Sequence, residues 1–488
     1  MILYTKPPML ISLIKNKVFW FVILLIKFIF LFLFGVQEMP DSSAYIELAE
    51  EIENNINSIF DFQNNSRMIG YSFVIYIIKS VFVKYWIVSI GFFQIIFSFF
   101  TLLFIFETLK KLKISTVSIK VLIILFSFST INKLELLILT DSIYGNLLVL
   151  IFCNFLRIYV TNDNLQIIKN SLMISLLLVI CFLIKDTTLV FLPLLLVFFT
   201  IIIVKFFLKE ITFKNFVINF MIIFLPILSI SETIKFQNLK KENYKYITLG
   251  GSTIYLYATV KPFLDRNLKN FNNNNEIDIT YKKFVTNNEF SNIYNMISEL
   301  KSKGFSDVEI LKYSKEKYFE IIQNPKNLMT IIIGNLKPTF VWGVFQPFLS
   351  LSQLYSIKVS DNSYWRTRLI LKKILSEKTL NFDLILFVLF LFEILISSSM
   401  FMLFLFTGMT NLRKMLSIKK KKKQDFSFII LISIIFYLLF CLLHLIVHIE
   451  PRYLVGTNFL FILSIILNFE KDISVLYDKI NNFTKKVL

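Results

Sequence analysis

The sequence predicts an all-α polytopic membrane protein with about ten transmembrane helices, an amphipathic first external loop and a larger α-rich external domain. Of its 488 residues, 56% are hydrophobic and only 17% are charged, whereas soluble domains carry roughly 25% charged residues. Long apolar runs also recur along the chain, and about 20 such residues cross a bilayer as a helix. This composition excludes a cytosolic enzyme, a disordered chain and a disulfide scaffold.

The predicted spans are the apolar runs that are long enough, or almost long enough, to cross a bilayer. The first run exceeds the roughly 7–15 apolar residues of a signal peptide and is followed by no small-residue cleavage site, so it is predicted to remain as the first span. An N-terminal module, 1–234, and a C-terminal module, 382–488, contain all of them. The spans are residues 18–36, 85–109, 119–133, 141–160, 171–184, 187–208, 215–234, 382–408, 426–446 and 454–469.

Basic residues predict the orientation of these spans, because lysine and arginine accumulate in cytoplasmic loops. They precede the first span, join the second to the third and the sixth to the seventh, and fill residues 413–423. The loop 37–66 instead has seven acidic residues and no basic one. We therefore expect both termini in the cytoplasm and this loop outside a plasma membrane, the inner membrane in a bacterium. The net charge of +19 is attributed to the cytoplasmic loops, and no nucleic-acid partner is predicted.

Two external segments are large. The first, 37–84, contains a helix-start signal at Asp41, after which apolar residues recur at helical spacing with glutamates on the other face. The second, 235–381, is predicted to be an external domain with two helices that are separated near Lys303-Gly304. Its apolar stretch 327–351 is predicted to be interfacial or re-entrant, because a crossing there would place the later lysine run outside.

Charged residues beside the predicted spans gather on the external face. Ionisable groups at a membrane are costly and tend to be functional. The carboxylates Asp41 and Asp141 could act as base and positioning group, and nearby cations could hold a phosphate whose charge grows as it leaves. The cations are Arg67, Lys185 and Arg452, of which the last two lie in the sequences Lys185-Asp186 and His448-Ile449-Glu450-Pro451-Arg452-Tyr453.

Simpler interpretations of these residues stay open. Asp41 could only cap a helix, Asp141 could only favour a helix dipole, and Lys185 could form a surface pair worth little. His444 and His448 lie four residues apart near Glu450, but no third ligand follows at a recognised spacing, so no metal site is assigned. Glu393, inside the eighth span, has no assigned role.

Four short stretches, taken in order, resemble the GT-C membrane glycosyltransferases, which include protein O-mannosyltransferases and the lipid A aminoarabinose transferase. The resemblance follows the order and topology of nearly the whole chain. The second stretch is like the family's Arg-Pro-Pro-Gly-Tyr sequence with both prolines replaced. The stretches are Pro40-Asp41-Ser42-Ser43-Ala44-Tyr45, Arg67-Met68-Ile69-Gly70-Tyr71, Leu139-Thr140-Asp141-Ser142 and Pro451-Arg452-Tyr453-Leu454.

The resemblance implies an enzyme that moves a sugar from a polyprenyl-phosphate donor to a lipid, glycan or protein acceptor outside the cytoplasm. Asp41 would be the base or would orient the acceptor, and Asp141 would be the second acid. The expected donor and substrate contacts are Arg67, Tyr71, Lys185, Arg452 and Tyr453. Where the mannosyltransferases have two adjacent acids, this chain has Asp41-Ser42, so use of a divalent cation as cofactor is left open.

Two other functions remain as alternatives. A lipid-linked oligosaccharide flippase or transporter would also use cations in a cavity, but it usually shows internal repeats and charges near the midplane. An O-antigen polymerase or ligase would share the multi-span layout, and its key arginines would lie in the late external loop. The charges at one face and the lack of a visible repeat disfavour the flippase, and the polymerase or ligase would not place a key acid after the first span.

Overall fold

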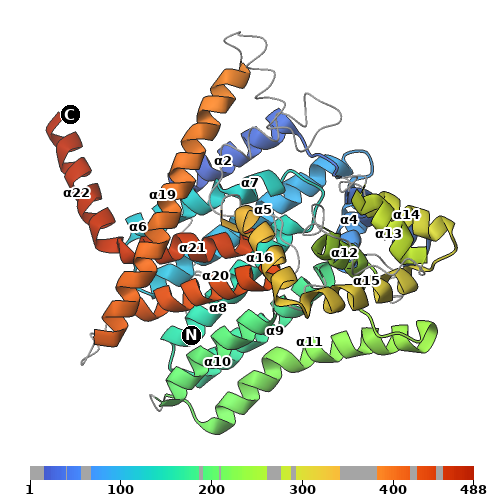
Figure 1. Ribbon diagram of the computed structural model, residues 1–488. Coiled ribbons are helices and arrows are strands. Elements are labelled where there is room, and N and C mark those ends of the chain that lie inside the picture. The colour runs from blue at the N-terminus through green and yellow to red at the C-terminus, as the bar shows by residue number, and fades with distance from the viewer. Residues whose placement is uncertain are drawn as a thin grey trace.

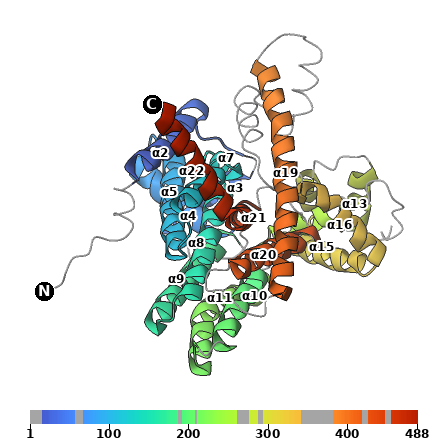
Figure 2. The same ribbon diagram turned by 90° about the vertical axis from the view of Figure 1, so that its left-hand side faces the viewer.

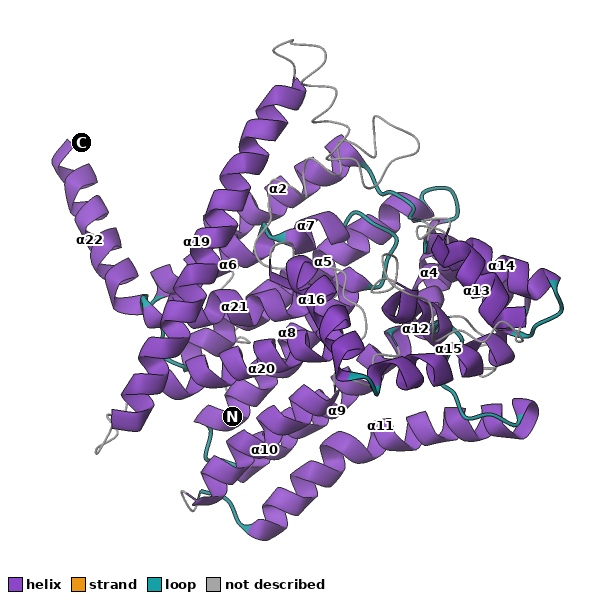
Figure 3. Ribbon diagram, in the orientation of Figure 1, coloured by secondary structure: helices purple, strands orange, loops and turns teal. Residues whose placement is uncertain are grey.

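The computed structural model describes residues 16–39, 41–56, 67–185, 191–207, 210–260, 276–286, 293–340, 382–417, 426–446 and 454–487. Within these ranges every regular element is a helix, and an isolated β-bridge is the only extended pairing (Figures 1 and 3). The all-helical prediction is therefore confirmed for the described part of the chain.

Six described helices are long and apolar enough to cross a bilayer. Shorter apolar helices accompany them, namely α4 (Ile69–Phe82), α6 (Thr116–Ser127), α10 (Phe191–Phe207) and α21 (Val455–Asn468), and α19 (Phe382–Ser417) is the longest helix. The chain is thus a multi-pass helical membrane protein, whereas the total of ten spans stays a prediction. The six are α2 (Lys17–Phe34), α5 (Trp86–Lys111), α8 (Asp141–Val160), α9 (Asn164–Ile184), α11 (Phe213–Glu242) and α20 (Ser427–Ile446).

Helix α8 is the central helix of the bundle. It is the most buried of the six long helices, and α5, α9, α10 and α21 all pack against it. Two glycines allow one of these contacts, because a Cβ atom on Gly456 of α21 would lie only 3.0 Å from the carbonyl oxygen of Gly145 in α8. At the periphery, Trp20 of α2 packs edge-on against Phe99 and Phe106 of α5. Figure 2 shows the same packing from a second direction.

The predicted span 119–133 is not one helix. Helix α6 ends at Ser127, and a short helix, α7 (Thr130–Leu134), begins after a break. At the break, the Ser129 hydroxyl donates a hydrogen bond to the carbonyl oxygen of Phe126. Serine competes for backbone hydrogen bonds in this way, which ends helices as readily as it begins them. The polypeptide then passes through turns and bends, with one bridge residue at Leu137, to the start of α8.

The helix that follows the first span is amphipathic. Helix α3 (Ser42–Asn54) buries Tyr45, Leu48, Ala49 and Ile52 on one face. Its opposite face carries glutamates, of which Glu50 and Glu53 lie 3.2 and 3.0 Å from the Lys79 ammonium of α4. The two helices therefore form a packed pair at the end of α2.

The segment that is predicted to be external contains α12 (Gly251–Val260), α13 (Glu276–Thr286), α14 (Ile293–Ser302), α15 (Asp307–Ile322) and α16 (Pro325–Phe340). The predicted break between two helices is confirmed. It lies at Gly304, whose φ of +93° suits glycine, and α15 begins with a capping box between Ser306 and Glu309. Helix α16 continues through the position of Lys337-Pro338, and residues 341–351 of the predicted re-entrant stretch lie outside the described residues.

Candidate functional site

A short parallel pairing brings the two candidate aspartates to the same end of the bundle. Helix α2 ends at Gly35, which has a φ of +69°, and the chain then pairs Gln37 with Leu137. The Gln37 amide donates to the Leu136 carbonyl at 2.9 Å, and the Ile138 amide donates to the Gln37 carbonyl at 3.1 Å. Because this bridge is parallel, the residues that follow Gln37 and Leu137 run in the same direction. Asp41 and Asp141 each come four residues after the pairing.

The starts of α3 and α8 are also tied by a side chain. The Ser42 hydroxyl, which is fully buried, donates to the Ile138 carbonyl at 2.7 Å and accepts from the Met39 amide at 2.7 Å. Gln94 of α5 donates to the Leu137 carbonyl at 2.9 Å. Both connections satisfy backbone groups that would otherwise be costly to bury. The segment before each aspartate is thereby fixed.

Asp41 stands at the N-cap position of α3, but it does not act as a cap. Its side chain makes no capping hydrogen bond. Instead, a carboxylate oxygen of Asp41 accepts from the Arg67 guanidinium at 2.9 Å. Arg67 lies just before α4, and its guanidinium also lies 5.6 Å from the centre of the Tyr45 ring, within the range of a cation–π contact. The capping interpretation of Asp41 is therefore wrong.

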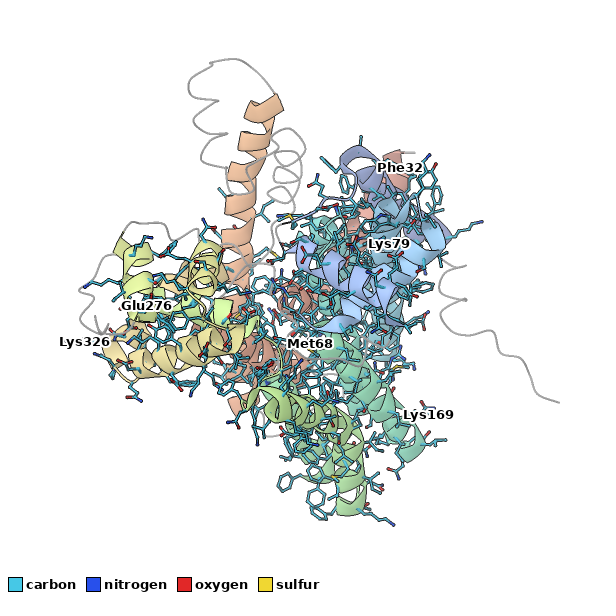
Figure 4. The ribbon with its side chains drawn as sticks, turned by 90° about the vertical axis from the view of Figure 1, so that its right-hand side faces the viewer. Phe32, Met68, Lys79, Lys169, Glu276 and Lys326 are labelled. Carbon is cyan, nitrogen blue, oxygen red and sulfur yellow. The ribbon has the colours of Figure 1, made fainter. Side chains whose placement is uncertain are left out.

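Asp141 and Lys185 form the second ion pair of the site. The Lys185 ammonium lies 2.7 Å from a carboxylate oxygen of Asp141 and 5.4 Å from the centre of the Tyr144 ring. Asp141 opens α8, and Lys185 directly follows the last residue of α9. Since α8 and α9 are consecutive helices, this pair lies where the first begins and the second ends. Figure 4 labels Lys169, near the start of α9, and Met68, the neighbour of Arg67, at separate places in the bundle.

Tyr45 connects the two ion pairs. Its phenol shares a hydrogen bond with the side chain of Thr140, the residue before Asp141, and its charge environment includes Asp41, Arg67 and Asp141. Burial raises the pKa of Tyr45, and the positive charge of Arg67 only partly opposes this effect. The phenol is therefore protonated at neutral pH. The Tyr45 ring also packs edge-on against Tyr71, at 5.3 Å between centroids.

The Tyr71 hydroxyl is a buried polar group inside this cluster. Its side chain is fully buried, and its hydroxyl has no hydrogen-bond partner among the described residues. A buried hydroxyl without a partner costs about 1–3 kcal/mol. The cost is recovered if a ligand or water supplies the partner, so Tyr71 is suited to contact a bound molecule.

A glycine sets the distance between the two cationic sides of the site. Gly70, in the first turn of α4, lies against the end of α9, and a Cβ atom there would be 2.7 Å from the Leu183 carbonyl oxygen. Arg67 comes three residues before this contact, and Lys185 comes two residues after it. Only glycine allows the two backbones to approach this closely.

The structure does not place the late candidates. Arg452, Tyr453, Asp186, His448 and Glu450 lie outside the described residues. These residues, apart from Asp186, belong to the late loop, 447–453, and the structure describes the residues on either side of it. The Leu445 and Ile446 carbonyls accept from Asn335 of α16 at 2.9 Å and from Tyr318 of α15 at 3.0 Å.

On the other side of the loop, Gly456 packs on Gly145, which lies about one turn into α8 from Asp141. The residues that flank the late loop therefore contact α15 and α16 on one side and the helix that carries Asp141 on the other.

Sequence reasoning missed a buried ion pair behind the site. The Lys27 ammonium, inside α2, lies 2.7 Å from both carboxylate oxygens of Glu135 and 3.3 Å from the Ser127 carbonyl. Both side chains are buried. Glu135 precedes Leu137, so the pair anchors the segment that leads to Asp141. The sequence does contain a signal for this pair, because Lys27 is an ionisable residue in the middle of the first apolar span.

Within the described residues, no three His, Cys, Asp or Glu side chains come together as a metal site would require. His444 uses its Nδ1 atom in a contact with the Phe440 carbonyl oxygen at 2.9 Å. The side chain of Glu393 lies outside the described residues. The site therefore consists of two carboxylates, two cations and a tyrosine cluster.

The fold and its long apolar helices define the class, a multi-pass helical membrane protein with a polar cluster at one end of the bundle. Comparisons with protein-family models, with curated proteins and with solved structures find no match.

Proposed function

We propose that the protein is a membrane glycosyltransferase that moves a sugar from a polyprenyl-phosphate donor to an acceptor on the extracytoplasmic face. One observation carries the proposal. Asp41, Arg67, Asp141 and Lys185, which lie far apart in the sequence, form two ion pairs that Tyr45 connects at one end of the bundle. A merely structural bundle has no need of two such pairs at one place, because ion pairs contribute little to stability.

The two carboxylates differ in access, and this difference assigns their roles. The Asp41 side chain is 15% exposed, whereas that of Asp141 is 3% exposed. A base must reach the acceptor hydroxyl, so Asp41 is the base. Asp141, which is more buried than its partner Lys185, orients that lysine and keeps its charge at the site.

The reaction is a direct displacement. The acceptor oxygen bonds to the anomeric carbon of the sugar, and the bond from that carbon to the phosphate oxygen breaks. Asp41 accepts the hydroxyl proton, and the polyprenyl phosphate leaves with the bonding electron pair. Arg67 and Lys185 stabilise the growing negative charge on this phosphate, and both are partly exposed and thus accessible to it.

The first experiment identifies the donor by mass spectrometry of the intact protein in mild detergent. We expect wild-type protein to carry a polyprenyl phosphate or its glycosylated form, and we expect a Lys185→Ala/Arg452→Ala variant to lose it. Lys79→Ala is the matched control, because the partners of Lys79 among the described residues are Glu50 and Glu53 on α3, so this variant should leave the lipid bound. A complete lipid-linked oligosaccharide on the wild-type protein would instead favour a flippase or polymerase.

The second experiment tests the base. With the identified donor, Asp41→Asn should lower sugar transfer by about 10²–10⁴-fold, the usual contribution of a general base, while donor binding persists. Asp163→Asn is the control, because Asp163 caps the start of α9, at the opposite end from Lys185. Full activity of Asp41→Asn would refute the assignment of the base.

A further inference from the structure

Helix α22 (Glu470–Val487) presents an apolar face that nothing in the described structure covers. It follows α21 after a single residue, Phe469, and Figure 1 shows it turning away from α21 and leaving the bundle. Leu476 and Ile480 are 59% and 55% exposed, and Tyr477 is exposed between them. Exposed apolar residues scattered singly need no explanation, but a continuous stripe marks an interaction surface.

The stripe follows helical spacing. Ile473, Leu476, Tyr477 and Ile480 are separated by three or four residues, so they share one face. Charged residues occupy most of the other described positions, which also include Ser474 and Val475, and the opposite face includes Asp478. A helix with one apolar and one charged face, and with polar residues throughout, lies in the plane of a membrane surface instead of crossing it.

The base of α22 is fixed at a definite end of the bundle. The Ser115 amide donates to a Glu470 carboxylate oxygen at 3.1 Å, and the Ser474 hydroxyl donates to the Ser115 hydroxyl at 3.0 Å. Ile473 packs against the main core. Ser115 precedes α6 and follows the lysine-rich end of α5, opposite the end that carries Asp41 and Asp141. The stripe therefore begins inside the bundle and continues outward at the level where α5 ends and α6 begins.

We propose that α22 lies along the bilayer surface at this end of the protein, with its stripe inserted among the lipids and its lysines contacting anionic headgroups. Two observations favour lipid over a protein partner. The stripe is continuous with the first turn of α22, which is packed at the ends of membrane helices. Its surroundings are also basic, because Lys471, Lys479, Lys485 and Lys486 of α22 join Lys110, Lys111 and Lys113, and clusters of lysine attract anionic lipid.

The test measures the depth of two positions on opposite faces of α22 in the full-length protein. The native cysteines Cys153, Cys181 and Cys441 are buried, so a nitroxide label attaches selectively to Ile480→Cys or to the matched control Asp478→Cys. Each labelled protein is placed in nanodiscs of phosphatidylethanolamine and phosphatidylglycerol. Electron paramagnetic resonance then reports collisions of the label with oxygen, which concentrates in lipid, and with a water-soluble nickel complex.

We expect the label at position 480 to collide severalfold more often with oxygen, and severalfold less often with nickel, than the label at position 478. Equal and high nickel collisions at both positions would overturn the proposal, because α22 would then extend into water. Protection at 480 together with spin–spin broadening that disappears on dilution with unlabelled protein would overturn it in favour of a second copy of the chain. The outcome does not depend on the proposed sugar transfer.

Discussion

Replacing Gly70 by alanine tests whether the close approach of α4 and α9 builds the site. The new Cβ atom would lie 2.7 Å from the Leu183 carbonyl oxygen and 2.8 Å from the Leu183 carbonyl carbon, whereas ordinary contact begins at 3.4 Å. The obstacle is backbone and cannot rotate away, so the two helices must separate by roughly 0.7 Å. Overpacking of this kind costs about 1–3 kcal/mol.

The separation also moves the two cations of the site apart. Arg67 lies before the start of α4, and Lys185 follows the end of α9, so a shift between these ends changes the distance between them. A misplacement of about 1 Å can cost on the order of 100-fold in rate. We expect Gly70→Ala to lower sugar transfer by roughly ten- to one-hundredfold and to lower the melting temperature in detergent.

Gly334→Ala is the control for this experiment. Gly334 lies inside α16, and a Cβ atom there would meet nothing within 4 Å. Alanine is favoured over glycine within helices by up to about 1 kcal/mol, so this variant should be as stable as the wild type or more stable. If Gly70→Ala and Gly334→Ala behaved alike in melting temperature and transfer, the packing argument would be refuted.

Two further predictions concern the buried groups around the site. Lys27→Met leaves the Glu135 carboxylate without its cation and should reduce the free energy of unfolding by about 3–5 kcal/mol. The double variant Lys27→Met/Glu135→Leu should recover most of this loss. A double variant as unstable as the single one would contradict the pairing. Because burial raises the pKa of Tyr45 above the usual 10.0, only the unfolded chain ionises this phenol just above pH 10, so stability should fall there by up to about 1.4 kcal/mol per pH unit. Tyr45→Phe should flatten that decline in urea titrations, and Tyr85→Phe, at an exposed position, should not.

The sequence contained the information for the elements of this protein. Apolar runs of suitable length predicted α2, α5, α8, α9, α11 and α20, since burial in lipid depends on local composition and length. The break at Gly304 followed from local turn chemistry, and the start of α3 followed from the helix-start sequence at Asp41, although this side chain does not cap the helix. The residues Asp41, Arg67, Asp141 and Lys185 were selected because charges beside membrane spans are costly unless they are used.

Only the tertiary structure decided how those residues combine. The local sequence is equally compatible with Asp41 as a helix cap. It does not show that the Asp41 carboxylate pairs with Arg67, which is 26 residues away. The partnership of Lys27 with Glu135 spans 108 residues, and no local pattern encodes the distance between two helices. The pairing of Gln37 with Leu137 and the contact at Gly70 fix those distances. Composition and periodicity determine which segments enter the membrane, whereas the position of each charge depends on packing between segments distant in sequence.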